Sequence, residues 1–183
     1  LETLAFQRAI LAHAGHAIIA TTTSGEIQHF NPAAERLLGY TAEETIGKLT
    51  PASFHDPEEV AARAKEFGKE LGLELEPGFE VLAIKARRNL PNQNEWTYIR
   101  KDGMRISVLL SVTALRDLHG SITGFLGMAL DLTDRKMAEA VVREAEERLE
   151  LAAEVAGVAV WEWDIRNGSL KWDRLMFALY GLP

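Results

Sequence analysis

The sequence contains no cysteine among its 183 residues. This absence excludes disulfides, thiolate metal sites, cysteine nucleophiles and any cysteinyl adduct to a chromophore, because each of these needs a thiol. Long apolar runs are also missing, and the longest falls far short of the roughly 20 residues that span a bilayer. We therefore predict neither a transmembrane segment nor a signal peptide.

Positive charge is scarce as well. The chain carries 20 Lys and Arg against 27 Asp and Glu, so its net charge is −7. An acidic balance without a basic stripe disfavours nucleic acid and anionic membranes as partners, and we predict contact with neither. Hydrophobic residues at 47% and charged residues at 26% are ordinary for a soluble globular protein.

The residue patterns of common catalytic sites are missing too. We find no glycine-rich phosphate loop, no serine elbow, no paired metal ligands and no phosphoacceptor histidine in a kinase-like box. The chain is therefore predicted not to be an enzyme. It begins at Leu1 rather than at a methionine and stops abruptly at Pro183, which we interpret as a piece of a longer protein whose missing part would carry any activity.

The N-terminal half is predicted to contain a cap helix, a hairpin and several capped helices. Residues 1–16 have the apolar spacing of a short amphipathic helix, which would cover part of a sheet or pair with a second copy. Asn31 is a good N-cap, and Thr41 and Glu44 have capping-box spacing. The predicted strands are 17–22 and 27–30, and the predicted helices are 32–38, 41–46, 56–70 and 78–86, the last with Phe79, Leu82 and Ile84 facing inward.

The stretch from Trp96 to Arg135 organises the rest of the chain. Three segments separated by turns, residues 96–100, 106–115 and 122–130, are predicted to form an antiparallel meander. Alternation puts Val108, Leu110, Val112 and Ala114 on one face of the middle strand. Neither side of the last strand is polar, so we predict that this strand is central.

At Asp131 the apolar period changes from two to about 3.6, which predicts a helix from Leu132 to about Val155. Its apolar residues recur with alternating steps of four and three, as in a heptad seam. Two interpretations stay open: a solvated helix that leans on its own domain, and a parallel dimer helix, which we favour. The seam consists of Ala138, Val142, Ala145, Leu149, Ala152 and Ala156.

Two segments of the sequence resemble the PAS sensor domains. The run Asp131-Leu132-Thr133-Asp134-Arg135 matches, at every position, the motif with which their sheet ends and a signalling helix begins. Residues 24–48, SGEIQHFNPAAERLLGYTAEETIGK, are PAS-like over their whole length. The resemblance implies an α+β PAS fold with a five-stranded antiparallel sheet and helices on one face.

The resemblance also implies a division of the chain. Residues 1–16 would be the N-terminal cap helix, 17–133 a PAS domain, and 134–156 a coiled-coil-like signalling linker. Residues 157–183 repeat the order of strand, turn and strand seen at the start of the first domain. We interpret this last segment as the start of a second, truncated PAS domain.

A cofactor is not identified by this resemblance. In the flavin-binding light-oxygen-voltage subfamily, a cysteine, two asparagines and a glutamine contact the flavin, and the matching positions here are Thr50, Tyr98, Val108 and Ala129. None carries the subfamily's residue, and unpaired polar groups of a flavin would cost about 1–3 kcal/mol each. Photochemistry of that type is disfavoured, whereas a flavin held differently stays open.

Haem is disfavoured as well. Haem-binding PAS domains use a histidine on a helix in the region of His55, but His55 precedes the predicted helix, and residues 60–86 contain no histidine. We interpret His55 as a cap or surface residue.

The alignment with the light-oxygen-voltage subfamily predicts a mostly apolar cavity, with Thr50 among its predicted binding residues. Such a cavity suits a small hydrophobic ligand, or its own side chains fill it, and both interpretations stay open. The residues that the alignment points toward it are Tyr98, Val108, Leu110, Val112, Phe125 and Ala129.

The function implied by the resemblance is sensory. The chain would be a cytoplasmic module that relays a change in its pocket to a histidine kinase or a cyclic-dinucleotide enzyme on the same chain. It would form a homodimer through the cap and linker helices. Asp131, paired with Lys101 or Arg100, and Thr133, as an N-cap, are the predicted signalling residues. The alternative function is a ligand-free dimerisation and relay module.

Overall fold

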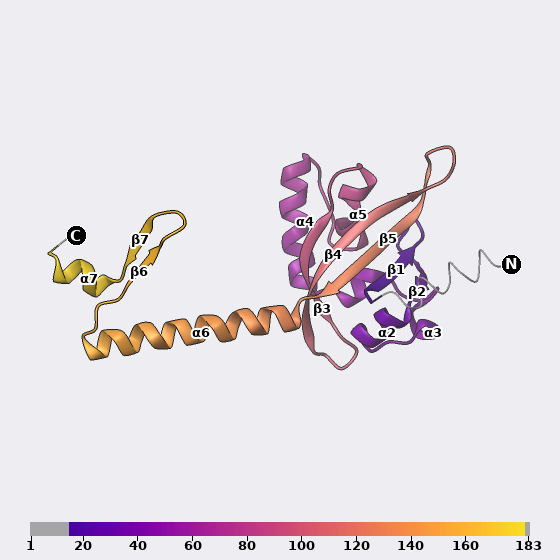
Figure 1. Cartoon of the computed structure of the whole chain (residues 1–183). Coiled ribbons are helices and arrows are strands. Elements are labelled where there is room, and N and C mark those ends of the chain that lie inside the picture. Colours follow the sequence, from indigo (N-terminus) through magenta and orange to yellow (C-terminus); the bar gives the residue numbers. More distant parts are fainter. Residues whose placement is uncertain (1–14, 182–183) are drawn as a thin grey trace. The chain divides into compact units, whose positions relative to one another are not determined.

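The computed structural model describes residues 15–181. The chain divides into two compact units, of which the first ends at Thr133 and the second begins at Asp134. The predicted cap helix, residues 1–16, lies almost entirely outside the described residues. Figure 1 labels the elements of both units.

The first unit is built on a five-stranded antiparallel sheet in the order β2-β1-β5-β4-β3. The long hairpin of β4 and β5 pairs Val108 with Asp131 at one end and Arg116 with Ile122 at the other. β5 lies between β4 and β1, so the predicted central strand is confirmed. The strands are β1 Ala17–Thr21, β2 Ile27–Phe30, β3 Gln93–Ile99, β4 Arg105–Arg116 and β5 Ile122–Asp131.

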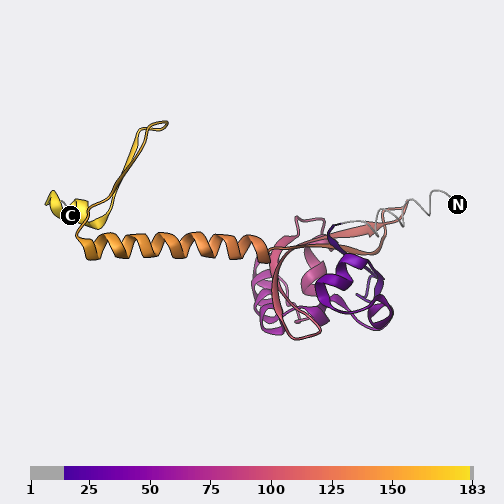
Figure 2. The ribbon, with the colours of Figure 1, turned by 60° about the horizontal axis from the view of Figure 1, so that its bottom comes forward.

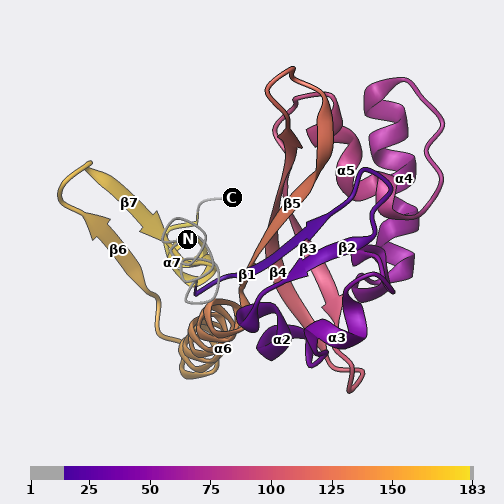
Figure 3. The same ribbon diagram turned by 90° about the vertical axis from the view of Figure 1, so that its right-hand side faces the viewer.

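Four α-helices and a 3₁₀ turn cover one face of this sheet (Figures 2 and 3). Asn31 begins the first helix, because its side-chain oxygen accepts hydrogen bonds from the backbone N–H groups of Ala34 and Ile18, both at 2.9 Å. Thr41 and Glu44 form the predicted capping box. The helices are α2 Pro32–Leu38, α3 Ala42–Thr45, α4 Pro57–Leu71 and α5 Phe79–Arg87, and the 3₁₀ turn η1 is Pro51–Phe54.

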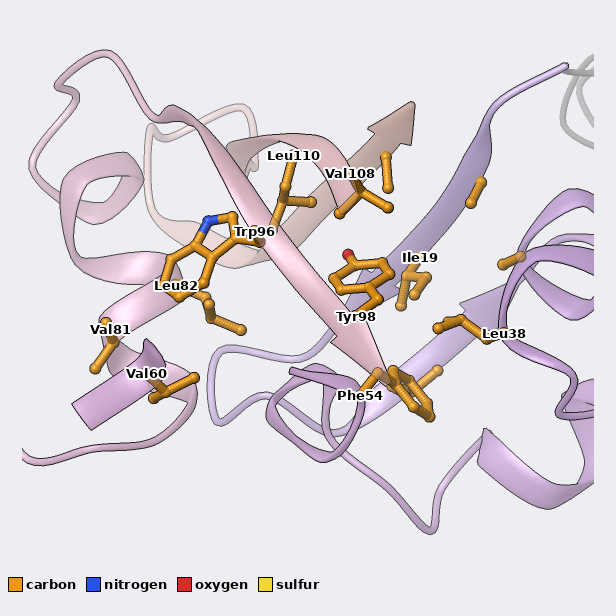
Figure 4. Close-up of a cluster of buried hydrophobic side chains, with 14 of the residues drawn as sticks. Ile19, Leu38, Phe54, Val60, Val81, Leu82, Trp96, Tyr98, Val108 and Leu110 are labelled. Carbon is orange, nitrogen blue, oxygen red and sulfur yellow. The ribbon is translucent and has the colours of Figure 1, made fainter. Parts of the chain in front are cut away.

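The core lies between the sheet and these helices (Figure 4). The inward faces of β4 and β3 contribute Val108, Leu110, Trp96 and Tyr98, all of which are buried. The opposite face of β5 is different, because Met128 and Leu130 remain 42% and 43% exposed. The sheet thus has one packed face and one exposed apolar face.

The outer edge of the sheet at β3 is occupied by the chain around α4. The N–H of Asp56 donates to the carbonyl of Thr97 at 3.0 Å, and the N–H of Thr97 donates to the Glu59 carboxylate at 2.7 Å. Arg63 donates to the carbonyl of Glu95 at 3.1 Å. These contacts satisfy backbone groups that an edge strand otherwise leaves open to pairing with another chain.

The second unit contains a long helix followed by a hairpin and a short helix. Every described residue of α6 is at least partly exposed, and the predicted hairpin is present as β6 and β7. That this hairpin starts a second PAS domain stays a prediction. Within the described residues no helix is long and apolar enough to cross a membrane. The elements are α6 Thr133–Ala156, β6 Trp161–Asp164, β7 Ser169–Trp172 and α7 Arg174–Leu179.

Candidate functional site

A small cavity lies inside the first unit, between the inner face of the sheet and α5. Five of the seven residues predicted to form the pocket line it: Tyr98, Leu110, Val112, Phe125 and Ala129. Val108 and Thr50 do not line the cavity, because Val108 is fully buried among other side chains and Pro51, the neighbour of Thr50, lies there instead. That the seven residues bind a ligand stays a prediction. The remaining lining residues are Ala17, Ile19, Thr21, Phe79, Leu82 and Gly127.

The cavity is nearly filled by the protein itself. Its free volume of about 20 Å³ has room for about one water molecule. Pockets for drug-sized ligands have volumes of roughly 300–1,000 Å³. A flavin therefore does not fit the cavity in this arrangement of the side chains.

Two hydroxyl-bearing residues stand out in this apolar lining. Thr21 is 4% exposed, and its hydroxyl has no hydrogen-bond partner in the part of the chain that the structure describes. A buried polar group without a partner costs about 1–3 kcal/mol. Burial raises the pKa of Tyr98, so its phenol stays neutral, and Figure 4 shows its hydroxyl oxygen directed away from Phe54.

His55 lies next to this region, and the structure corrects its predicted place on the surface. The side chain is only 2% exposed and packs edge-on against Trp96 and Tyr98, with ring centroids 5.0 and 4.7 Å away. Nδ1 lies 2.8 Å from the carbonyl oxygen of Pro51. Because a carbonyl only accepts, Nδ1 carries the proton in the neutral ring. Nε2 then has no partner among the described residues, and burial lowers the pKa of His55 to about 4.

A charge pair between a buried carboxylate and an exposed arginine follows His55. Asp56 is buried, pairs with Arg105 and also accepts the backbone N–H of Glu58 at 2.9 Å, so it begins α4. The pair joins the start of α4 to the start of β4. No group of three or more His, Asp or Glu residues that could hold a metal ion occurs among residues 15–181.

The junction between β5 and α6 is the second part of the site. The Asp131 carboxylate accepts the backbone N–H of Thr133 at 2.8 Å, and the N–H of Leu132 donates to the carbonyl of Ser107 at 2.9 Å. Asp131, rather than Thr133, therefore provides the polar contact to the first turn of α6. The predicted N-cap was wrong, because the Thr133 hydroxyl has no partner within the described residues.

The predicted ion pairs of Asp131 are also wrong. Arg100 lies 3.5 Å from Asp102 and donates to carbonyl oxygens at the end of α2. Lys101 pairs with Glu44. Both bases thus hold the turn between β3 and β4 against α2 and α3, and this leaves Asp131 with its local backbone contact.

Comparison with known proteins identifies the family. A model described as the PAS fold matches residues 5–132. The chain belongs to the PAS family. The five-stranded sheet, the helices on one face and the strand that leads into a long helix agree with this assignment, and the predicted α+β PAS fold is confirmed.

Curated relatives of this PAS chain are larger signalling proteins. It is 28% identical over 161 residues to the probable diguanylate cyclase DgcE of Escherichia coli (strain K12), and the alignment covers 88% of this chain and 13% of that protein. It is 29% identical over 168 residues to the signal transduction histidine-protein kinase AtoS of the same organism, and the alignment covers 91% of this chain and 24% of that protein. The chain thus spans less than a quarter of the length of either relative.

Solved structures support the fold alone. The PAS domain of a protein from Colwellia psychrerythraea superposes with a TM-score of 0.58 at 20% identity, covering 72% of this chain and 98% of that chain. The family match and the curated relatives together identify the chain as a PAS sensor domain of the kind found in signalling proteins.

Proposed function

We propose that this chain relays the state of its PAS core through the end of β5 into α6, and from there to an effector domain on the same chain. One observation carries the proposal. β5 is the central strand, lines the cavity with Phe125, Gly127 and Ala129, and continues through Asp131 and Leu132 into α6 without an intervening loop. A displacement of β5 at the cavity therefore moves the start of the helix.

The relatives support two classes of effector. One is named as a diguanylate cyclase and another as a histidine kinase, and both classes consume nucleotides, which agrees with a cytoplasmic location. A ligand or a partner that changes the core would be the input. The effector output would then follow the position or rotation of α6.

Replacing Asp131 by alanine tests the relay. The substitution removes the acceptor of the Thr133 N–H, so the start of α6 is no longer tied to β5. In a longer form of the protein that keeps its effector, we expect the signal-dependent change in effector activity to fall by about fivefold or more. Loss of the cap costs only about 1 kcal/mol of stability, so circular dichroism should show a folded protein.

Asparagine at the same position is the matched control. Asp131→Asn keeps a side-chain oxygen that accepts the Thr133 N–H but removes the charge. It should retain most of the response. A response that is unchanged in Asp131→Ala would contradict the relay through this contact.

Dimerisation through α6 is a second part of the proposal. The heptad seam is solvent-exposed in the single chain, with Leu149 at 71% and Val142 at 57%. An apolar stripe on a helix is stabilised when it packs against a second stripe. A glutamate at Leu149 would place a charge in the seam, and we expect it to raise the dimer dissociation constant at least about tenfold, measured by sedimentation equilibrium.

Leu151 provides the control for this experiment. It is 61% exposed on the same helix, but it lies outside the seam, two positions after Leu149. Leu151→Glu should leave the dissociation constant within about twofold of the original chain. Equal effects of the two substitutions, or no effect of either, would remove α6 from the dimer interface.

A ligand-free relay module is the second candidate function. The small volume of the cavity favours it, because side chains already occupy most of the core. In this form the input would be a protein contact instead of a bound molecule. An absorption spectrum of purified protein without flavin or haem bands, and no compound released on denaturation, would favour this candidate.

A further inference from the structure

An open groove lies on the first unit where β5 approaches the start of α6. Its free volume is about 310 Å³, which falls within the roughly 300–1,000 Å³ of pockets that hold small ligands. We propose that this groove binds a free amino acid with an aliphatic side chain. This inference rests on the proposed function, because it names an input that acts directly at the start of the relay helix.

The groove forms because β5 extends beyond its neighbour β1 at this end of the sheet. The register between the two strands ends at the pair of Ala17 and Ala129, whereas β5 continues to Asp131. The helix α2 supplies another wall of the groove, with Ala33 and Leu37. The groove is thus built from the end of β5, the start of β1 and α2.

This groove differs in chemistry from the internal cavity. The two linings share Ala17 and Ala129, but the cavity adjoins α5, and no charged residue is among the described residues that line it. The groove is lined by the charged residues Arg36, Arg100 and Asp131. A charged ligand therefore suits the groove, whereas the lining of the cavity would leave a charge without a partner.

Asp131 is the anionic residue of the groove. One oxygen of its carboxylate accepts the backbone N–H of Thr133 at 2.8 Å. The other oxygen has no hydrogen-bond partner within residues 15–181, and the residue is exposed. An ammonium group on a ligand would bind this second oxygen through a charge-assisted hydrogen bond. The contact that ties β5 to the first turn of α6 stays in place when it does so.

Arg36 is the cationic residue that a ligand would bind. It lies in the last turn of α2 and is exposed, and its guanidinium has no hydrogen bond or ion pair in the part of the chain that the structure describes. Arg100 is already engaged, because it donates to the carbonyl oxygens of Arg36 and Leu37. A carboxylate on the ligand would therefore be bound by Arg36, whose planar fork matches both carboxylate oxygens.

Charged groups of both signs in one groove select a zwitterion. A free amino acid carries an ammonium group and a carboxylate on the same carbon, and each would meet a group of opposite sign. A dianion would be repelled by Asp131, and a polyamine would be repelled by Arg36. The rest of the lining favours an aliphatic side chain, because it includes Ala17, Ala33, Leu37 and Ala129.

Leucine, 4-methylpentanoate and 3-methylbutylamine form a matched series of probes. They share a branched aliphatic chain, but the second lacks the amine of leucine and the third lacks its carboxylate. We expect leucine to bind the 183-residue chain and to shift the NMR signals of the amides that line the groove. The two analogues should bind at least about fivefold more weakly. No shift at about 10 mM leucine, or equal affinity of leucine and either analogue, would overturn the site.

Arg36→Gln and Asp131→Asn test the two charged contacts separately. Arg36→Gln should weaken leucine about fivefold and leave 3-methylbutylamine within about twofold. Asp131→Asn should also weaken leucine about fivefold, but it should not weaken 4-methylpentanoate. Lys65→Gln is the control for the loss of a positive charge, because Lys65 is exposed on α4 and outside the groove. Equal weakening of all three probes, or an equal effect of Lys65→Gln and Arg36→Gln, would overturn the assigned contacts.

The result for the groove is separable from the result for the relay. Binding is measured on the 183-residue chain, which needs no effector, whereas the relay is read from the effector response of Asp131→Ala. If leucine does not bind and Asp131→Ala still lowers the response, the groove fails as a binding site and the relay stands. If leucine binds as expected and Asp131→Ala leaves the response unchanged, the relay fails and the binding site stands.

Discussion

Gly124→Ala should destabilise the PAS domain by about 3 kcal/mol in urea unfolding. A Cβ atom at Gly124 would overlap the backbone carbonyl oxygen of Thr21 on the neighbouring strand β1. Because the obstacle is backbone within the sheet, it cannot move aside as a flexible side chain would. Overpacking of this kind typically costs 1–3 kcal/mol and occasionally more, and a shift of β1 would also disturb the side of the cavity that Thr21 lines.

Gly127→Ala is the matched comparison in the same strand. Here a Cβ atom would lie 3.5 Å from the Leu110 side chain and 3.7 Å from the carbonyl of Ile19, which are ordinary contacts. Gly127 lines the cavity, so the added methyl group would fill part of it. We expect a gain of about 0.5–1 kcal/mol, since glycine costs that much in a strand relative to alanine. Equal effects of the two substitutions would contradict the packing of β5 described above.

Acid should destabilise the protein through His55. Its pKa is about 4 in the folded protein and about 6.5 in an unfolded chain. As the pH falls, His55 therefore binds a proton in the unfolded state at a higher pH than in the folded state. The contribution of the neutral His55 to the free energy of unfolding is complete above pH 6.5 and is lost progressively between pH 6.5 and pH 4. The difference of about 2.5 units corresponds to about 3 kcal/mol.

The contribution of His55 is isolated by comparing pH profiles of variants. Carboxylates in general also bind protons as the pH falls toward 4, so the His55→Phe variant is needed to separate the contribution of His55 from theirs. The free energy of unfolding of this variant should fall less between pH 7 and pH 4 than that of the original chain, by about 3 kcal/mol. The exposed His119, replaced in the same way, should leave the profile unchanged. A profile that His55→Phe does not flatten would contradict the neutral, buried state of this ring.

Much of the sheet and its junction with the helix could be predicted from the sequence, because these features depend on local pattern. The two apolar sides of β5, with Phe125 and Ala129 on one side and Met128 on the other, predict a central strand. The change of period at Asp131 locates the start of α6. Alternation along β4 separates buried from exposed positions, and Asn31 and Thr41 cap helices through contacts within a few residues.

The features that the sequence did not reveal depend on contacts between distant segments. His55 is buried because the chain before α4 pairs with Tyr98 on β3, and no local pattern announces that pairing. Thr21 and Ile19 line the cavity because β1 pairs with β5. Alternation along β1 could have placed both on the inner face, but only the order of the strands puts that face against the cavity. The contacts of Arg100 with α2 and of Lys101 with α3 could not be predicted for the same reason, since these helices are distant in the sequence.

The most direct test of the relay is the rate of amide hydrogen exchange in the first turn of α6, compared between two overpacked variants. Ala129→Leu enlarges a buried residue of β5 at the cavity, and Ala64→Leu enlarges a buried residue of α4 away from β5. At similar overall stability, the account predicts faster exchange at residues 133–137 in Ala129→Leu only. Equal exchange rates there in both variants would contradict transmission through β5.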